Sequence, residues 1–67
     1  MMNKEDCVAM LLNNGYRATL ESGVIILSLA NEKDVKRAFK DVRNMGYKAS
    51  LGARIVNGKN VKFERTN

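Results

Sequence analysis

An eight-residue segment occurs twice in this chain, and it constrains the fold more than any other feature of the sequence. Residues 13–20 read Asn-Asn-Gly-Tyr-Arg-Ala-Thr-Leu, and residues 44–51 read Asn-Met-Gly-Tyr-Lys-Ala-Ser-Leu. Five of the eight positions are identical, two are Arg/Lys and Thr/Ser replacements, and one differs. Apolar residues at helical spacing precede both copies. A repeat of this period indicates two copies of one supersecondary unit.

Each copy of the unit begins with a predicted helix that ends at the glycine of the repeated segment. Asn3 and Asn31 are predicted N-caps, and each precedes an aspartate by three residues. Gly15 and Gly46 occupy the position just after a helix, where the backbone needs a positive φ. The apolar spacing between these signals predicts helices over roughly residues 4–14 and 32–45.

Two short strands are predicted after each helix. Residues 16–20 alternate in polarity, whereas Val24–Leu29 is an apolar, β-branched run typical of a strand covered on both faces. By analogy, residues 47–51 form a third strand, and the tyrosines at 16 and 47 pack under the helices. Asn57-Gly58 is a strong signal for a hairpin that leads into a last strand ending at Glu64, with Gly52 as a bulge or bend in a long third strand.

The predicted element order is αββαββ in an α+β fold. Neither copy can bury its apolar side alone, so we expect one antiparallel sheet with both helices on one face. This order resembles a ferredoxin-like fold, or a circularly permuted variant with its first strand moved to the end. We expect a single domain over residues 1–67, with one repeat at 3–29 and the other at 31–64. Over residues 7–51 the order is also similar to that of SPOR domains, which bind peptidoglycan, although no strand precedes the first helix.

The composition argues against several kinds of chemistry. The chain has one cysteine and no histidine. It therefore lacks the usual zinc ligand sets, an internal disulfide and histidine-based catalysis. The sequence also lacks a P-loop and an evident pair of catalytic carboxylates. We therefore expect a protein that is not an enzyme and that needs no cofactor and no metal. No apolar run is long enough to cross a membrane, and no signal-peptide pattern is evident, so a cytoplasmic location is expected.

Positive charge is concentrated in the second half of the chain. The net charge is +5, and residues 31–67 hold ten basic and four acidic side chains. At 100° per residue, the cations of the second helix fall within an arc of about 120°, and the C-terminal segment is also basic. The residues predicted to contact the phosphates of a nucleic acid are Lys36, Lys40, Arg43, Lys59 and Lys62.

Two classes of function are consistent with this pattern. Nucleic acid is the leading partner, bound without catalysis through the basic helix edge and the C-terminal hairpin. The alternative is a protein–protein interaction or regulatory module that acts as a homodimer through the uncovered face of the sheet, because two short helices can cover only one face. For the helix, the competing interpretation is a solvated surface. For the C-terminal segment, it is an edge strand whose lysines prevent aggregation.

Overall fold

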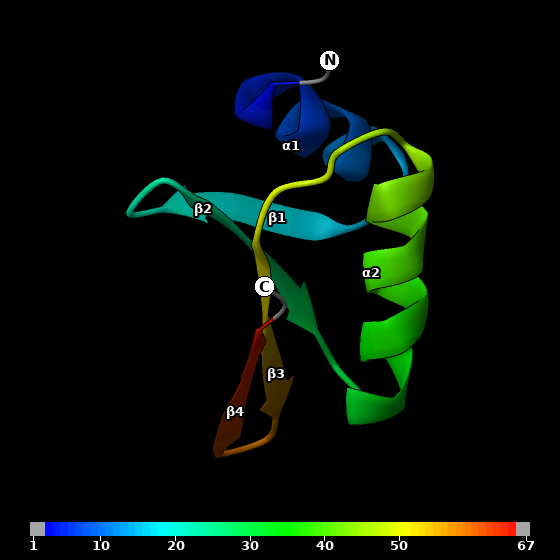
Figure 1. The fold of residues 1–67 in the computed structure, drawn as a ribbon. Coiled ribbons are helices and arrows are strands. Elements are labelled where there is room, and N and C mark those ends of the chain that lie inside the picture. The colour runs from blue at the N-terminus through cyan, green and yellow to red at the C-terminus, as the bar shows by residue number, and fades with distance from the viewer. Residues whose placement is uncertain (1–2, 66–67) are drawn as a thin grey trace.

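The computed structural model describes residues 3–65, which form two helices and a four-stranded sheet (Figure 1). The element order is αββαββ, as the sequence predicts, with a short 3-10 turn, η1, before the second helix. The elements are α1 (Lys4–Asn13), β1 (Arg17–Glu21), β2 (Val24–Leu29), η1 (Glu32–Asp34), α2 (Val35–Asn44), β3 (Leu51–Asn57) and β4 (Asn60–Arg65).

The strands follow the chain in the order β1-β2-β3-β4, but the sheet is mixed. The β1–β2 and β3–β4 pairs are antiparallel, whereas β2 and β3 run parallel, with Ile25 opposite Leu51. The prediction of a purely antiparallel sheet is therefore wrong. A helix that joins two neighbouring strands returns the chain to the end of the sheet where the first strand began, so α2 makes β2 and β3 parallel. In a ferredoxin-like sheet another strand lies between the two parallel strands that a helix connects, whereas here β2 and β3 are direct neighbours.

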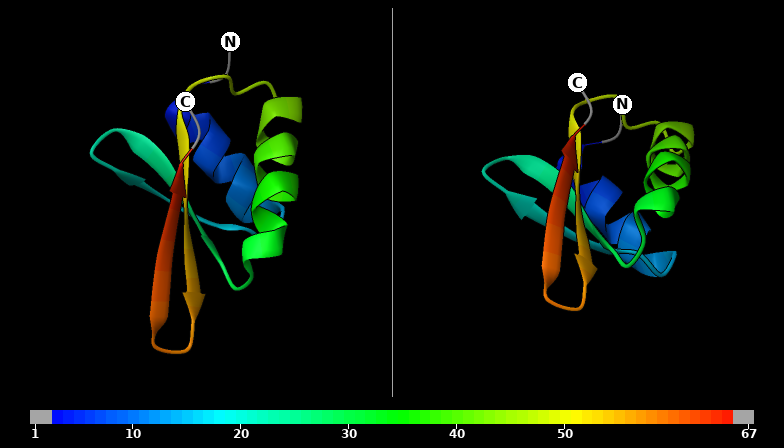
Figure 2. Two further views of the ribbon diagram at one scale, coloured as in Figure 1. Left: turned by 60° about the horizontal axis from the view of Figure 1, so that its bottom comes forward. Right: turned by 90° about the horizontal axis from the view of Figure 1, so that it is seen from below.

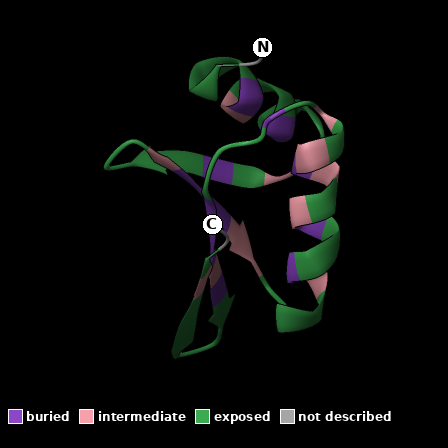
Figure 3. Ribbon diagram, viewed as in Figure 1, coloured by how far each residue is buried: buried purple, intermediate pink, exposed green. Residues whose placement is uncertain are grey.

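The core lies between the two helices and one face of the sheet (Figures 2 and 3). Alternation along the strands places their buried side chains on that face, with the exception of Ile26, while the charged side chains of β1 and β3 lie on the other. Both repeated tyrosines contact the core, Tyr47 fully buried and Tyr16 partly so. The main core residues are Cys7, Leu11, Ala18, Ile25, Leu27, Val35, Ala38, Val42, Leu51, Ala53 and Ile55.

The repeated segment encodes a helix end. In each copy the glycine N–H donates to the carbonyl three residues earlier, and the tyrosine N–H donates to the carbonyl five residues earlier. Gly15 and Gly46 have φ values of 88° and 105°, as this type of helix C-terminus requires. The N-termini are not equivalent. The Asn3 side chain accepts from the Asp6 N–H at 2.8 Å, whereas the Asn31 side chain caps nothing.

The two copies diverge after the tyrosine. β1 begins at Arg17, but β3 begins only at Leu51, so residues 47–50 form a loop and the predicted third strand is displaced toward the C-terminus. The Arg43 guanidinium donates from Nη1 to the Tyr47 and Ala49 carbonyls, at 3.0 and 2.6 Å. It thereby holds the loop against the end of α2. The loop leads the chain from the end of α2 to the sheet, where β3 pairs beside β2 with Leu51 opposite Ile25.

The last hairpin turns one residue later than predicted. Gly58 and Lys59 are the two turn residues, and Asn57 lies opposite Asn60 at the end of the strands. Gly58 has a φ of 63°, and the first of two turn residues is where glycine is preferred in a type II′ hairpin.

Gly52 is not a bulge, because β3 and β4 pair without interruption. Its missing side chain instead provides space. A Cβ at this position would lie 2.6 Å from Ile26 Cδ1 and 3.0 Å from Phe63 Cζ. Two side chains from neighbouring strands therefore pack over the Gly52 backbone on the face that the helices do not cover.

Candidate nucleic-acid interface

The solvent-facing side of η1 and α2 carries four cations and one amide. Val35, Ala38 and Val42 face the core, which turns the opposite arc of the helix outward. Figure 3 shows this outward side as exposed. The exposed residues on the arc are Lys33, Lys36, Arg37, Lys40 and Asn44. We refer to the four cations as the α2 stripe.

The acidic residues of this segment lie on the flanks of the α2 stripe. Asp41 accepts a 2.6 Å hydrogen bond from the Tyr16 hydroxyl, and Glu32 accepts one of 2.7 Å from Lys62 Nζ. Asp34 lies on the same flank as Asp41. The hydrogen bond to Asp41, together with partial burial, raises the pKa of Tyr16. The negative charge of η1 and α2 is thus kept off the outward arc.

A polar hollow of about 560 Å³ borders the α2 stripe where α2 passes the end of α1. Arg37 lies at this border, where its positive charge partly opposes the rise in the Tyr16 pKa. The amides of Asn14 and Asn44 and the carboxylate of Asp41 also line the hollow. Amide and guanidinium groups of this kind can hydrogen-bond a base edge or a sugar next to a bound phosphate.

Two of the five residues predicted to contact phosphates, Lys36 and Lys40, lie on the α2 stripe. Arg43 is half-buried at its edge, and its guanidinium is hydrogen-bonded to the carbonyls of the following loop. Arg43 therefore positions the α2–β3 loop. The helical period already placed Lys33 and Arg37 on the same arc, but neither was included among the predicted phosphate contacts.

The two predicted hairpin cations have different surroundings. Lys62 Nζ lies 2.7 Å from Glu32 Oε1 and 3.8 Å from Glu64 Oε1, and the contact with Glu32 raises the pKa of this lysine. The ion pair connects β4 with η1, the turn that precedes α2. However, two carboxylates balance the charge of Lys62. Lys59 is exposed in the turn.

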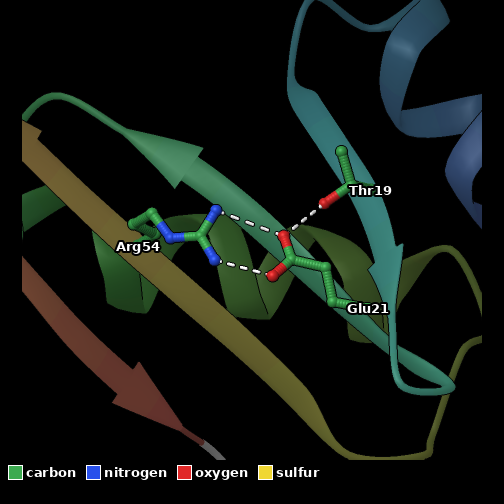
Figure 4. Close-up of polar contacts among 3 residues, drawn as sticks. All are labelled: Thr19, Glu21 and Arg54. Carbon is green, nitrogen blue, oxygen red and sulfur yellow. Dashed lines mark hydrogen bonds and ion pairs between the residues drawn. The ribbon is translucent and has the colours of Figure 1, made fainter.

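The face of the sheet opposite the helices is mixed in character. Arg54 on β3 reaches across β2 to Glu21 on β1 and forms a two-pronged ion pair, with Nη2–Oε1 and Nη1–Oε2 distances of 2.7 and 3.2 Å (Figure 4). Thr19 Oγ1 also donates to this carboxylate, at 2.8 Å. Its hydrogen bonds, from Arg54 above all, lower the pKa of Glu21. The surface is thus less apolar than the β2 sequence suggested.

Ile26 lies on this face and is nevertheless only 4% exposed. The Phe63 side chain packs beside it over Gly52, so the chain itself covers this apolar position. Ile26 therefore needs no second molecule to shield it, although Val56, Val61 and Phe63 remain exposed on the hairpin.

Comparisons of the chain with protein-family models, with curated proteins and with solved structures found no match. Within residues 3–65, no helix is long and apolar enough to span a membrane. Over the same residues, no group of three or more His, Cys, Asp or Glu side chains is placed to hold a metal ion.

Proposed function

We propose that this protein is a small noncatalytic nucleic-acid-binding protein that contacts the phosphate backbone through the α2 stripe. The observation that supports this proposal is the exposed arc of Lys33, Lys36, Arg37 and Lys40, from which every acidic side chain of η1 and α2 is absent. From residue 33 to residue 40 the arc is about 10 Å long, which spans about three phosphates of one strand.

The binding is expected to be weak and independent of sequence. Lysine contacts to phosphates release counterions, which favours association at low salt without reading the bases. Arg37 and the adjoining hollow provide the hydrogen-bonding groups nearest to the stripe. The competing interpretation is that these cations only keep the helix solvated, and it predicts that their position does not matter.

The test compares two variants of equal net charge. In K33Q/K36Q/K40Q the stripe loses three lysines, and in the control K4Q/R17Q/K48Q three exposed cations elsewhere are replaced. Either change lowers the net charge from +5 to +2. Arg43 is left intact because its replacement would release the α2–β3 loop.

Fluorescence anisotropy with labelled single- and double-stranded oligonucleotides of about 20 nucleotides, at about 25 to 200 mM salt, measures the binding. The log–log salt slope should flatten by about 2 to 3 units in the stripe variant, and clearly less in the control. Equal losses in the two variants would mean that the charge acts diffusely. Undetectable binding of the wild type at low salt would falsify the proposed function.

A further inference from the structure

β4 is an edge strand without the proline or the bulge that often protects an edge from pairing. It lies at the end of the sheet, and both views of Figure 2 show it on the outer side of the last hairpin. Edge strands are normally protected by proline, by a bulge, or by a charged side chain on the edge. The chain has no proline, and β4 pairs with β3 without a bulge. The charged side chains of β4 are of both signs, Lys62, Glu64 and Arg65, and Lys62 is paired with Glu32 on the helix side of the sheet.

The hairpin register identifies the backbone groups of β4 that point outward. Asn57 and Asn60 enclose the two-residue turn and therefore form a hydrogen-bonded pair. Antiparallel pairs alternate between hydrogen-bonded and non-hydrogen-bonded. Val61, Phe63 and Arg65 consequently direct their N–H and C=O groups away from β3. Their side chains lie on the uncovered face, where Val61 is 64% and Phe63 50% exposed.

We propose that two copies of the chain pair antiparallel along β4, with Phe63 of one copy opposite Phe63 of the other. The two four-stranded sheets would then form one continuous sheet with a two-fold axis at Phe63. In this register the outward N–H and C=O groups of one copy face those of the other, because Val61 lies opposite Arg65 of the second copy. Three such pairs allow about six backbone hydrogen bonds.

The charges of β4 select this register. With Phe63 on the axis, Lys62 of each copy lies opposite Glu64 of the other, so the pairing produces two cross-strand pairs of opposite charge. If the axis moved by one residue in either direction, it would place Lys62 opposite Lys62 or Glu64 opposite Glu64, and like charges facing each other are unfavourable. Among these three registers, only the one centred on Phe63 joins opposite charges.

The dimer is expected to be weak and reversible, and independent of the proposed nucleic-acid binding. Two six-residue strands bury little surface, so we expect a Kd on the order of 100 µM. The α2 stripe lies on the outward side of the helix layer and takes no part in the contact. The alternative to a second copy at the β4 edge is an extended strand of another protein.

A charge-exchange experiment tests the pairing. Sedimentation equilibrium should show the wild type shifting from a 7.5 kDa monomer toward a dimer as its concentration rises to about 1 mM. K62E and E64K should each weaken self-association by roughly tenfold or more, since each places like charges opposite one another. An equimolar mixture of the two variants should restore it, because the mixed dimer again joins opposite charges. A wild type that stays monomeric, or a mixture that is not restored, would overturn the proposal.

Disulfide formation checks the register, with Val61 as the matched control. In the proposed dimer the two Phe63 Cα atoms lie about 5.5 Å apart, within the range of a disulfide. The two Val61 positions are offset by four residues, or about 13 Å, which is beyond it. Under mild oxidation F63C should therefore form a covalent dimer and V61C should not, while Cys7 remains buried in both. Equal crosslinking of the two variants, or crosslinking of V61C alone, would contradict this register.

Discussion

Gly52 allows Ile26 and Phe63 to pack over β3, and replacing it with alanine tests this packing directly. The new Cβ would lie 2.6 Å from Ile26 Cδ1, far inside the optimal carbon–carbon separation of about 3.5–4.0 Å. Overpacking of this kind costs about 1–3 kcal/mol. Gly52 has no positive φ, so alanine fits its backbone and recovers about 0.4–1 kcal/mol by restricting the unfolded chain. We expect Gly52→Ala to lower the free energy of unfolding by about 1–2 kcal/mol.

A second substitution identifies the atom responsible. Ile26→Val deletes the δ1 methyl group that the new Cβ would meet, and by itself should cost about 0.5–1.5 kcal/mol. In the double variant the alanine occupies the vacated space, so its cost should fall below the sum of the single costs by about 1 kcal/mol. Ile25→Val is the matched control, because Ile25 loses the same methyl group on the opposite face of the sheet, and its effect should add to that of Gly52→Ala.

Urea unfolding followed by far-UV circular dichroism compares the wild type with the three single variants and with the two double variants that combine Gly52→Ala with Ile26→Val or with Ile25→Val. Thermal unfolding provides a second measure, since 1 kcal/mol corresponds to about 4–8 °C in a domain of this size. Additive costs of Gly52→Ala and Ile26→Val would refute the close contact between the two positions. A stabilised Gly52→Ala variant would show that Ile26 and Phe63 move aside without loss.

Two further predictions concern polar contacts. Arg43→Met should lower the free energy of unfolding by about 1–2 kcal/mol in urea titrations, because two loop carbonyls lose their donor. The same variant should change the salt slope of oligonucleotide binding by less than the replacement of one stripe lysine does. The pKa of Glu21, followed by NMR, should lie below the usual glutamate range in the wild type and rise toward it in Arg54→Gln, because Arg54 is the main cause of the lowering. Since folding lowers this pKa, the stabilisation is present above the ordinary glutamate pKa and is lost as pH falls through the folded-state value. The difference in urea midpoint between wild type and Arg54→Gln should therefore shrink in acid, and a constant difference would contradict this assignment.

The sequence alone determined the features that depend on a few neighbouring residues. A positive φ at Gly15 and Gly46 ends both helices in the same way, and the helical period turns Lys36 and Lys40 outward. The apolar run of β2 was predicted with its observed bounds, Val24–Leu29. These features follow from backbone conformation and side-chain period, which act within one or two turns of the chain.

The tertiary structure decided what depends on residues far apart in the chain. The crossover through α2 made β2 and β3 parallel, and the loop after α2 moved the third strand to Leu51. Arg43 and Lys62 appeared available to a partner in the sequence, but the fold directs them to loop carbonyls and to Glu32. The space above Gly52 likewise exists only once Ile26 and Phe63 meet from different strands. A local pattern can identify a charge or a glycine, but the groups that surround it are set by long-range packing.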